Sequence, residues 1–190
     1  MNNELKSVAE KIKIVITDVD GVLTDGTIYK GNDGREFKRF SILDGAGVVL
    51  ARSAELKIVL LSGRFSPATA ARAKELGLSD DCYQGEIDKL KVYKELKTKY
   101  DFSDDEAAFL GDDFIDLPVM EKVGLPIASA NAVSDVKKKS KYVTEVKGGE
   151  GAFREAIEMI LKLQGKYDTA IKHFQQMIHN HRRGKDYGEQ

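Results

Sequence analysis

The chain of 190 residues has little of several features that mark particular classes of protein. Its single cysteine, Cys82, excludes an intrachain disulfide and a metal site built of several cysteines. Lys plus Arg number 30 and Asp plus Glu number 31, so the net charge of −1 provides no overall attraction to nucleic acid or membranes. No apolar run approaches the roughly 20 residues of a membrane span, and the charged N-terminal segment lacks the apolar core of a signal peptide. We therefore expect a cytoplasmic protein that binds neither nucleic acid nor membranes.

Short β-branched segments alternate with segments of helical spacing along most of the chain. The apolar run at 12–17 stops at the polar turn Asp18-Val-Asp-Gly, which is typical of a buried parallel strand. We expect further strands at 57–61, 82–83, 107–110, 125–128 and 142–144, and helices at 68–76, 88–100 and 115–123. This alternation predicts a doubly wound, mainly parallel α/β sheet.

Residues 26–40 depart from this alternation. The turn sequence Gly31-Asn-Asp-Gly34 lies between two arms whose apolar residues alternate, which predicts a β-hairpin inserted after the first strand. We expect one domain at 1–165 that contains this hairpin. The tail at 166–190 is predicted to be helical to about His181 and then flexible.

Short intervals separate Asp20, Ser62 and Lys89, polar residues that each follow a predicted strand, and these intervals argue against a separate cap domain. Only 41 residues lie between Asp20 and Ser62, and only 26 lie between Ser62 and Lys89. Once the hairpin and one helix are subtracted, neither gap can hold a second domain. A site without a cap is open to water, so a neighbouring subunit is expected to cover it.

Polar residues follow the predicted strands at the carboxyl edge of the sheet, where ligands bind in open α/β folds. They are Asp18, Asp20, Ser62, Arg64, Lys89, Asp112, Asp113 and Asp116, with Gly63 between Ser62 and Arg64. Converging carboxylates repel one another unless a cation neutralises them, and Mg²⁺ prefers carboxylate oxygens and waters. Phosphate is the ligand that suits Mg²⁺, a hydroxyl and an ammonium together. The sequence therefore predicts a site for phosphoryl transfer.

Three aspartates are assigned the central roles in this chemistry. Asp18 would attack phosphorus and form an aspartyl phosphate. Asp20 would protonate the leaving oxygen and then deprotonate the water that hydrolyses the intermediate. Asp112 would complete the metal shell to which Asp18 and Asp20 also belong.

Four other residues are predicted to assist. Ser62 and Lys89 would hold the phosphoryl oxygens, where negative charge is concentrated. Asp113 would orient Lys89 or a metal-bound water. Asp116 would either support the site or interact with the charge of a helix terminus.

These motifs, in this order, resemble those of the haloacid dehalogenase-like phosphatases. They read Asp18-Val-Asp-Gly-Val-Leu-Thr-Asp25-Gly, Leu61-Ser-Gly-Arg64, Gly85-Glu-Ile-Asp-Lys89 and Gly111-Asp-Asp-Phe-Ile-Asp116. Flanking segments over about 12–160 narrow the resemblance to the group that hydrolyses 3-deoxy-D-manno-octulosonate 8-phosphate, a step in lipopolysaccharide sugar biosynthesis. They include Gly31-Asn-Asp-Gly34, Asp44-Gly45 and Lys147-Gly-Gly-Glu-Gly151. The resemblance implies a Rossmann-like fold without a cap, Mg²⁺, a cytoplasmic location and a homotetramer in which the hairpins pack together.

The resemblance also implies a set of substrate contacts. They are Asp20, Ser41, Ile42, Leu43, Asp44, Gly45, Gly63, Arg64, Arg72 and Lys89. Arg64 and Arg72 would suit the carboxylate of a sugar acid, which arginine binds with two parallel hydrogen bonds. The chain departs from the group at Ala46 and Val49, where an aromatic residue and an arginine are common.

Two alternatives remain open at this point. The same chemistry could act on a nine-carbon keto-sugar acid 9-phosphate of the sialic acid type, although Arg64 favours the eight-carbon substrate. A phosphate-receiving signalling domain also uses acidic residues, a hydroxyl and a lysine on an α/β sheet. In such a receiver the acidic pair comes first and the lysine late, whereas here Lys89 precedes the pair Asp112-Asp113.

Overall fold

A computed structural model describes residues 3–186, and a six-stranded parallel sheet forms its centre. The strand order is β5-β4-β1-β6-β7-β8, so the chain builds outward from β1 on one side and then returns to start again on the other. The strands are β1 (Ile14–Thr17), β4 (Lys57–Ser62), β5 (Cys82–Gln84), β6 (Ala107–Gly111), β7 (Leu125–Ala128) and β8 (Tyr142–Val143). The predicted doubly wound sheet is confirmed, and no cap domain is evident among the described residues.

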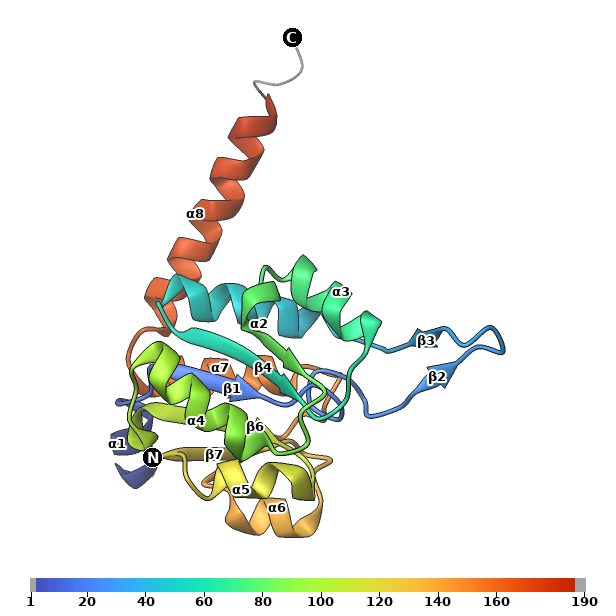
Figure 1. The fold of residues 1–190 in the computed structure, drawn as a ribbon. Helices are drawn as coiled ribbons and strands as arrows, with labels where there is room; N and C mark the ends of the chain where they lie inside the picture. Colours follow the sequence, from blue (N-terminus) through green and yellow to red (C-terminus); the bar gives the residue numbers. More distant parts are fainter. Residues whose placement is uncertain (1–2, 187–190) are drawn as a thin grey trace.

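Helices cover both faces of this sheet (Figure 1). The α-helices are α1 (Asn3–Ala9), α2 (Ile42–Ser53), α3 (Pro67–Glu75), α4 (Lys89–Tyr100), α5 (Leu117–Met120), α6 (Ser134–Lys139), α7 (Ala152–Leu163) and α8 (Tyr167–Asp186). Three 3₁₀ turns join them, η1 (Ser79–Asp81), η2 (Asp104–Glu106) and η3 (Phe114–Asp116). The helix predicted at 115–123 is therefore wrong in its bounds. A 3₁₀ turn capped by Asp113 comes first, and the α-helix that follows ends at Met120.

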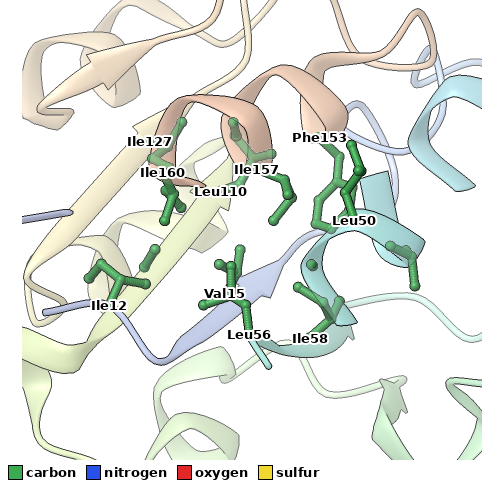
Figure 2. Close-up of a cluster of buried hydrophobic side chains, with 14 of the residues drawn as sticks. Ile12, Val15, Leu50, Leu56, Ile58, Leu110, Ile127, Phe153, Ile157 and Ile160 are labelled. Atoms are coloured by element: carbon green, nitrogen blue, oxygen red, sulfur yellow. The ribbon is translucent and has the colours of Figure 1, made fainter. Parts of the chain in front are cut away.

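The central strands bury both faces because each contributes alternate residues to two apolar clusters. In β1, Val15 packs toward α2 and α7, whereas Ile14 and Ile16 belong to the cluster under α4 and α5. Figure 2 shows the first cluster, in which Ile157 and Ile160 of α7 face Val15 of β1 and Leu50 of α2 lies beside Phe153. Burying each such side chain contributes on the order of 1.5–3 kcal/mol, so these contacts fix the sheet and, with it, the strand ends.

Helix α2 forms despite two internal glycines, each of which lowers helix stability by about 1 kcal/mol relative to alanine. Its packing explains the exception. A Cβ on Gly47 would lie 3.0 Å from Cα of Arg154 in α7, so only glycine lets the two helices approach this closely. Ser41 begins the helix as its N-cap, with its hydroxyl accepting a hydrogen bond from the Leu43 amide.

The predicted hairpin is present and projects from the body of the molecule (Figure 1). Strands β2 (Tyr29–Lys30) and β3 (Glu36–Phe37) pair antiparallel, with Tyr29 opposite Phe37. At the other end of the chain, α8 packs its first turns on α2 and α7 and then continues outward (Figure 1). It runs beyond the predicted end near His181 to Asp186, and residues 187–190, where part of the predicted flexible tail falls, lie outside the described residues.

Candidate active site

The site begins where β1 and β6 end side by side. Thr17 pairs with Leu110, and the Asp18 amide donates a hydrogen bond of 2.9 Å to the Leu110 carbonyl. The strand order reverses at this point. The segments that follow the two strands therefore lead away from each other and leave a crevice. The residues that follow the two strands, Asp18 and Asp112, are therefore neighbours.

A buried lysine joins two of the aspartates. The ammonium of Lys89, at the start of α4, lies 2.8 Å from Oδ1 of Asp18 and 2.6 Å from Oδ1 of Asp116. The Lys89 side chain is fully buried, and the two carboxylates are nearly so. Oδ2 of Asp116 accepts hydrogen bonds from the amides of Asp112 and Asp113, so Asp116 fixes both the lysine and the loop after β6. Asp116, and not Asp113, contacts Lys89, whereas Oδ1 of Asp113 accepts from the Phe114 amide. The other role predicted for Asp113, orienting a metal-bound water, remains a prediction.

The carboxylates carry more negative charge than Lys89 neutralises. Burial raises the pKa of Asp18 to about 7, although the charge of Lys89 opposes this. Burial and the charges of Asp18 and Asp116 raise the pKa of Asp112 to about 8. Burial alone would lower the pKa of Lys89, but the two carboxylates outweigh it and hold that pKa above its ordinary value. The cluster is therefore suited to a further cation.

A divalent metal ion fits this cluster. Carboxylate oxygens of Asp18, Asp112 and Asp116 all lie within 4.8 Å of one another. Oδ1 of Asp112 is buried and has no hydrogen-bond partner among the described residues, which leaves it free for an ion. Gly21 makes room for that side chain, because a Cβ at this position, with φ of +86°, would lie 2.0 Å from Oδ2 of Asp112.

The cluster lies at a pocket of about 420 Å³. The lining residues are Asp18, Asp20, Gly26, Ile28, Ser62, Gly63, Arg64, Ile87, Asp112, Asp113 and Ile115. Ser62 ends β4, and its hydroxyl both accepts from the Arg64 amide and donates to the Arg64 carbonyl, which shapes the loop that follows. The Ser62 hydroxyl and the carboxylates of Asp18 and Asp112 thus meet at one cavity, with the buried Lys89 in contact with Asp18. This arrangement can bind and transfer a phosphoryl group.

Known proteins are similar to this chain in sequence and in architecture. A family model for haloacid dehalogenase-like hydrolases matches residues 80–155. The 3-deoxy-D-manno-octulosonate 8-phosphate phosphatase KdsC of Escherichia coli strain K12 is 42% identical over 162 residues, which are 85% of this chain and 86% of that protein. The chain belongs to the family of 3-deoxy-D-manno-octulosonate 8-phosphate phosphatases. The resemblance read from its motifs is thereby confirmed.

Solved structures of this phosphatase family agree. The Moraxella catarrhalis enzyme, in complex with a magnesium ion, a phosphate ion and KDO, superposes with a TM-score of 0.87 at 36% identity and covers 92% of this chain and 99% of that one. The cobalt-bound Haemophilus influenzae enzyme gives a TM-score of 0.80 at 38% identity, with 84% and 93% of the two chains covered. Within the described residues, none of the helices has the length and apolar character that a membrane span requires.

In this member of the phosphatase family, some of the predicted site residues lie apart from the pocket. Ser41, Ile42, Leu43, Asp44 and Gly45 form the cap and first turn of α2, and none of them is among the described residues that line the pocket.

Two charged residues near this turn make contacts within the chain. Arg72 donates to the Ser41 carbonyl at 3.1 Å and pairs with Glu75 at 2.8 Å. Asp44 is buried, and one of its oxygens accepts from the Arg154 amide at the start of α7. The substrate contacts assigned to these two residues and to the rest of the turn remain predictions.

The structure adds residues that the motifs did not reveal. The Asn131 amide group donates to the Gly21 carbonyl and accepts from the Gly148 amide, so it ties the turn after β1 to a distant loop. Lys38 pairs with Asp20 from the hairpin. No spacing rule predicts Asn131, whereas the alternation of charged residues in the second hairpin arm was a usable signal for Lys38.

Proposed function

We propose that this protein hydrolyses 3-deoxy-D-manno-octulosonate 8-phosphate to the free sugar acid and phosphate, as a step in lipopolysaccharide sugar biosynthesis. The observation that carries the proposal is the cluster at the pocket, where Asp18 lies against Lys89 and the unpartnered Oδ1 of Asp112. Family membership over most of the chain supports the choice of substrate.

Asp18 is the proposed nucleophile. Lys89 and the Val19 amide both hold Oδ1 of its carboxylate, at 2.8 and 2.7 Å, so the group has one fixed orientation at the pocket. In the first step a bond forms between an Asp18 oxygen and phosphorus while the bond from phosphorus to the sugar oxygen breaks. Water then attacks the aspartyl phosphate and releases phosphate.

Asp20 is the proposed acid and base. It lies two residues beyond Asp18, lines the same pocket and is partly exposed, so its carboxyl group can reach a leaving oxygen there. Its proton passes to the sugar oxygen in the first step, and it takes a proton from water in the second.

Mg²⁺ is the cofactor, and Asp18 and Asp112 would hold it together with Asp20. Asp20 follows Asp18 by two residues and lines the same pocket. When bound, the ion would supply positive charge that offsets the charge of the phosphoryl oxygens. Ser62 and Lys89 would bind those oxygens beside it.

The sugar acid would be recognised at the pocket mouth. Arg64 lines the pocket and is 42% exposed, and one of its guanidinium nitrogens pairs with Glu36 at 2.8 Å, so the substrate carboxylate would bind the remaining N–H groups or displace Glu36. Arg72 and residues 41–45 are proposed as further contacts, reached when the substrate extends beyond the pocket.

A homotetramer is the proposed assembly, in the cytoplasm. Large apolar side chains are exposed around the pocket and on the hairpin. They include Ile28, Tyr29, Phe37, Phe65, Ile87 and Phe114. Such a concentration of exposed apolar side chains is typical of a surface that another chain covers. A neighbouring subunit seated there would shield the pocket that this chain leaves open.

A nine-carbon keto-sugar acid 9-phosphate is the second candidate substrate. The observation that favours it is the pair Ala46 and Val49, which replaces the aromatic residue and arginine common in the eight-carbon group. Both lie in α2 next to the predicted substrate turn.

Phosphate release from the two sugar phosphates, measured side by side with Mg²⁺, tests the proposal. We expect a higher kcat/KM on the eight-carbon substrate, loss of turnover in EDTA, and a fall of at least about 10³-fold in Asp18→Asn because the nucleophile is gone. Asp135→Asn, an exposed carboxylate on α6, is the matched control and should retain full activity. A preference for the nine-carbon sugar phosphate would show that the proposed substrate is wrong. Unchanged turnover in Asp18→Asn would show that the proposed mechanism is wrong.

A further inference from the structure

The second arm of the hairpin carries charged side chains that point toward the body of the molecule. Residues alternate in direction along an extended strand, so Glu36 and Lys38 share one face. Glu36 contacts the Arg64 guanidinium at 2.8 Å and the Ser66 hydroxyl at 3.0 Å. Phe37, between them, is 57% exposed on the opposite face. The second hairpin arm therefore contacts Arg64, a residue that lines the pocket.

Lys38 is the most deeply placed of these side chains, with none of its side-chain surface exposed. Its ammonium lies 2.6 Å from Oδ1 and 2.9 Å from Oδ2 of Asp20, and 3.1 Å from the hydroxyl of Thr69 in α3. An ammonium has three N–H donors, and these three contacts can use all of them. Since Thr69 is itself buried, the lysine is fixed from both sides.

We propose that Lys38 is the positioning residue for the proton transfer that Asp20 performs. The inference rests on the proposed function, because it assigns a role within that reaction. Asp20 sits in a turn after the strand end and is 26% exposed, so its side chain has other rotamers available in solvent. Because Lys38 contacts both oxygens of the Asp20 carboxylate, it restricts that side chain to one rotamer. A misplacement of about 1 Å at a reacting group can cost on the order of 10²-fold in rate.

This arrangement separates the two aspartates of the first motif. Lys89 holds Asp18 from α4, and Lys38 holds Asp20 from the hairpin. Lys38 transfers no proton itself, and the bonds made and broken in the reaction are those given above.

The dependence of rate on the leaving group tests this role. The steps up to phosphoryl transfer determine kcat/KM, so it reports the proton donated to the leaving oxygen and not the later attack of water. A sugar oxygen is a poor leaving group that needs this proton, whereas p-nitrophenolate leaves without it. In Lys38→Met we expect kcat/KM to fall by about 10²-fold on the sugar phosphate and by less than about 10-fold on p-nitrophenyl phosphate.

Two further variants make the result specific. Thr69→Val keeps the shape of the side chain and removes the hydroxyl that anchors Lys38, so it should lower the sugar phosphate rate selectively, by a few-fold. Lys57→Met removes a lysine whose partner, Asp81, lies 2.7 Å away at the opposite end of the strands, and it should change neither rate. If Lys38→Met does not fold, as judged by circular dichroism, the selectivity of Thr69→Val decides.

The outcomes separate the inference from the proposed function. Equal losses on both substrates in a folded Lys38→Met, or no loss on either, would overturn the positioning role. If the wild type prefers another sugar phosphate, the proposed substrate is wrong, but the same comparison on the preferred ester still tests Lys38. A wild type that hydrolyses no phosphomonoester would overturn both.

Discussion

The two lysines of the site hold neighbouring aspartates in very different surroundings. Lys89 comes from α4 and lies among carboxylates at the end of the central strands, with Asp116 fully buried and Asp18 6% exposed. Lys38 comes from the hairpin and holds Asp20, which is 26% exposed. The first arrangement is fixed by the core of the sheet, and the second depends on an insertion that packs against it.

This difference predicts how each pair contributes to stability. A buried charge that loses its partner cannot be hydrated, whereas a partly exposed one can recover hydrogen bonds to water. The cluster of Lys89, Asp18 and Asp116 should therefore lose more stability when its lysine is removed. The pair of Lys38 and Asp20 should matter more for catalysis than for folding.

The largest effect is expected from Lys89→Met. It leaves two buried carboxylates unpaired, so the free energy of unfolding should fall by about 3–5 kcal/mol in metal-free buffer. Lys38→Met should cost less, about 1–2 kcal/mol, because water can reach Asp20. Urea denaturation of the purified variants measures both.

Lys97→Met is the matched control for this pair of variants. It removes a partly exposed lysine that is 2.7 Å from Asp104, far from the pocket, and exposed ion pairs contribute about 1 kcal/mol at most. Equal losses in Lys89→Met and Lys38→Met would contradict the contrast between the two regions.

An effect smaller than that of Lys89→Met, and dependent on pH, is expected at Asp44, a buried carboxylate outside both regions. Burial raises its pKa from 3.8 to about 6, although the Arg154 and Phe153 amides and the charges of Arg72 and Arg154 oppose this. A carboxyl pKa that is higher in the folded state favours folding at low pH, and the benefit is lost as pH rises through the folded value. Between about pH 4 and pH 7 the wild type should lose about 2 kcal/mol through this group.

Asp44→Asn removes this titration. The difference in unfolding free energy between the variant and the wild type should therefore shift in favour of the variant by that amount as pH rises, whatever constant offset the new amide introduces. A difference for Asp44→Asn that stays flat with pH would show that its carboxylate is not held in a costly environment.

The strand-end part of the site was open to prediction because it depends on chain order alone. Once 12–17 and 107–110 are recognised as parallel strands, the residues after them must meet at one edge, and the structure places Asp18 and Asp112 there. The hairpin was likewise predictable, because Gly31-Asn-Asp-Gly34 favours a tight turn between alternating arms.

Other parts depend on contacts between distant segments. Residues 41–45 are still predicted substrate contacts, but the sequence did not show that they cap and begin α2. The close approach of α7 explains the glycine at position 47 inside this helix. The alternation of charged residues in the second hairpin arm was a signal for the direction of the Lys38 side chain but not for its partners or its burial. The position of Lys38 follows from the contacts of its ammonium with Asp20 and Thr69.

The central claim is that Asp18 becomes transiently phosphorylated, and chemical trapping tests it most directly. Wild-type enzyme quenched during turnover of the sugar phosphate with Mg²⁺ can be treated with borohydride, which reduces an aspartyl phosphate to homoserine, and then digested for mass spectrometry. We predict homoserine at position 18 only, and none when substrate is omitted. Homoserine at Asp112 or Asp116, or continued turnover in Asp18→Asn, would contradict the account.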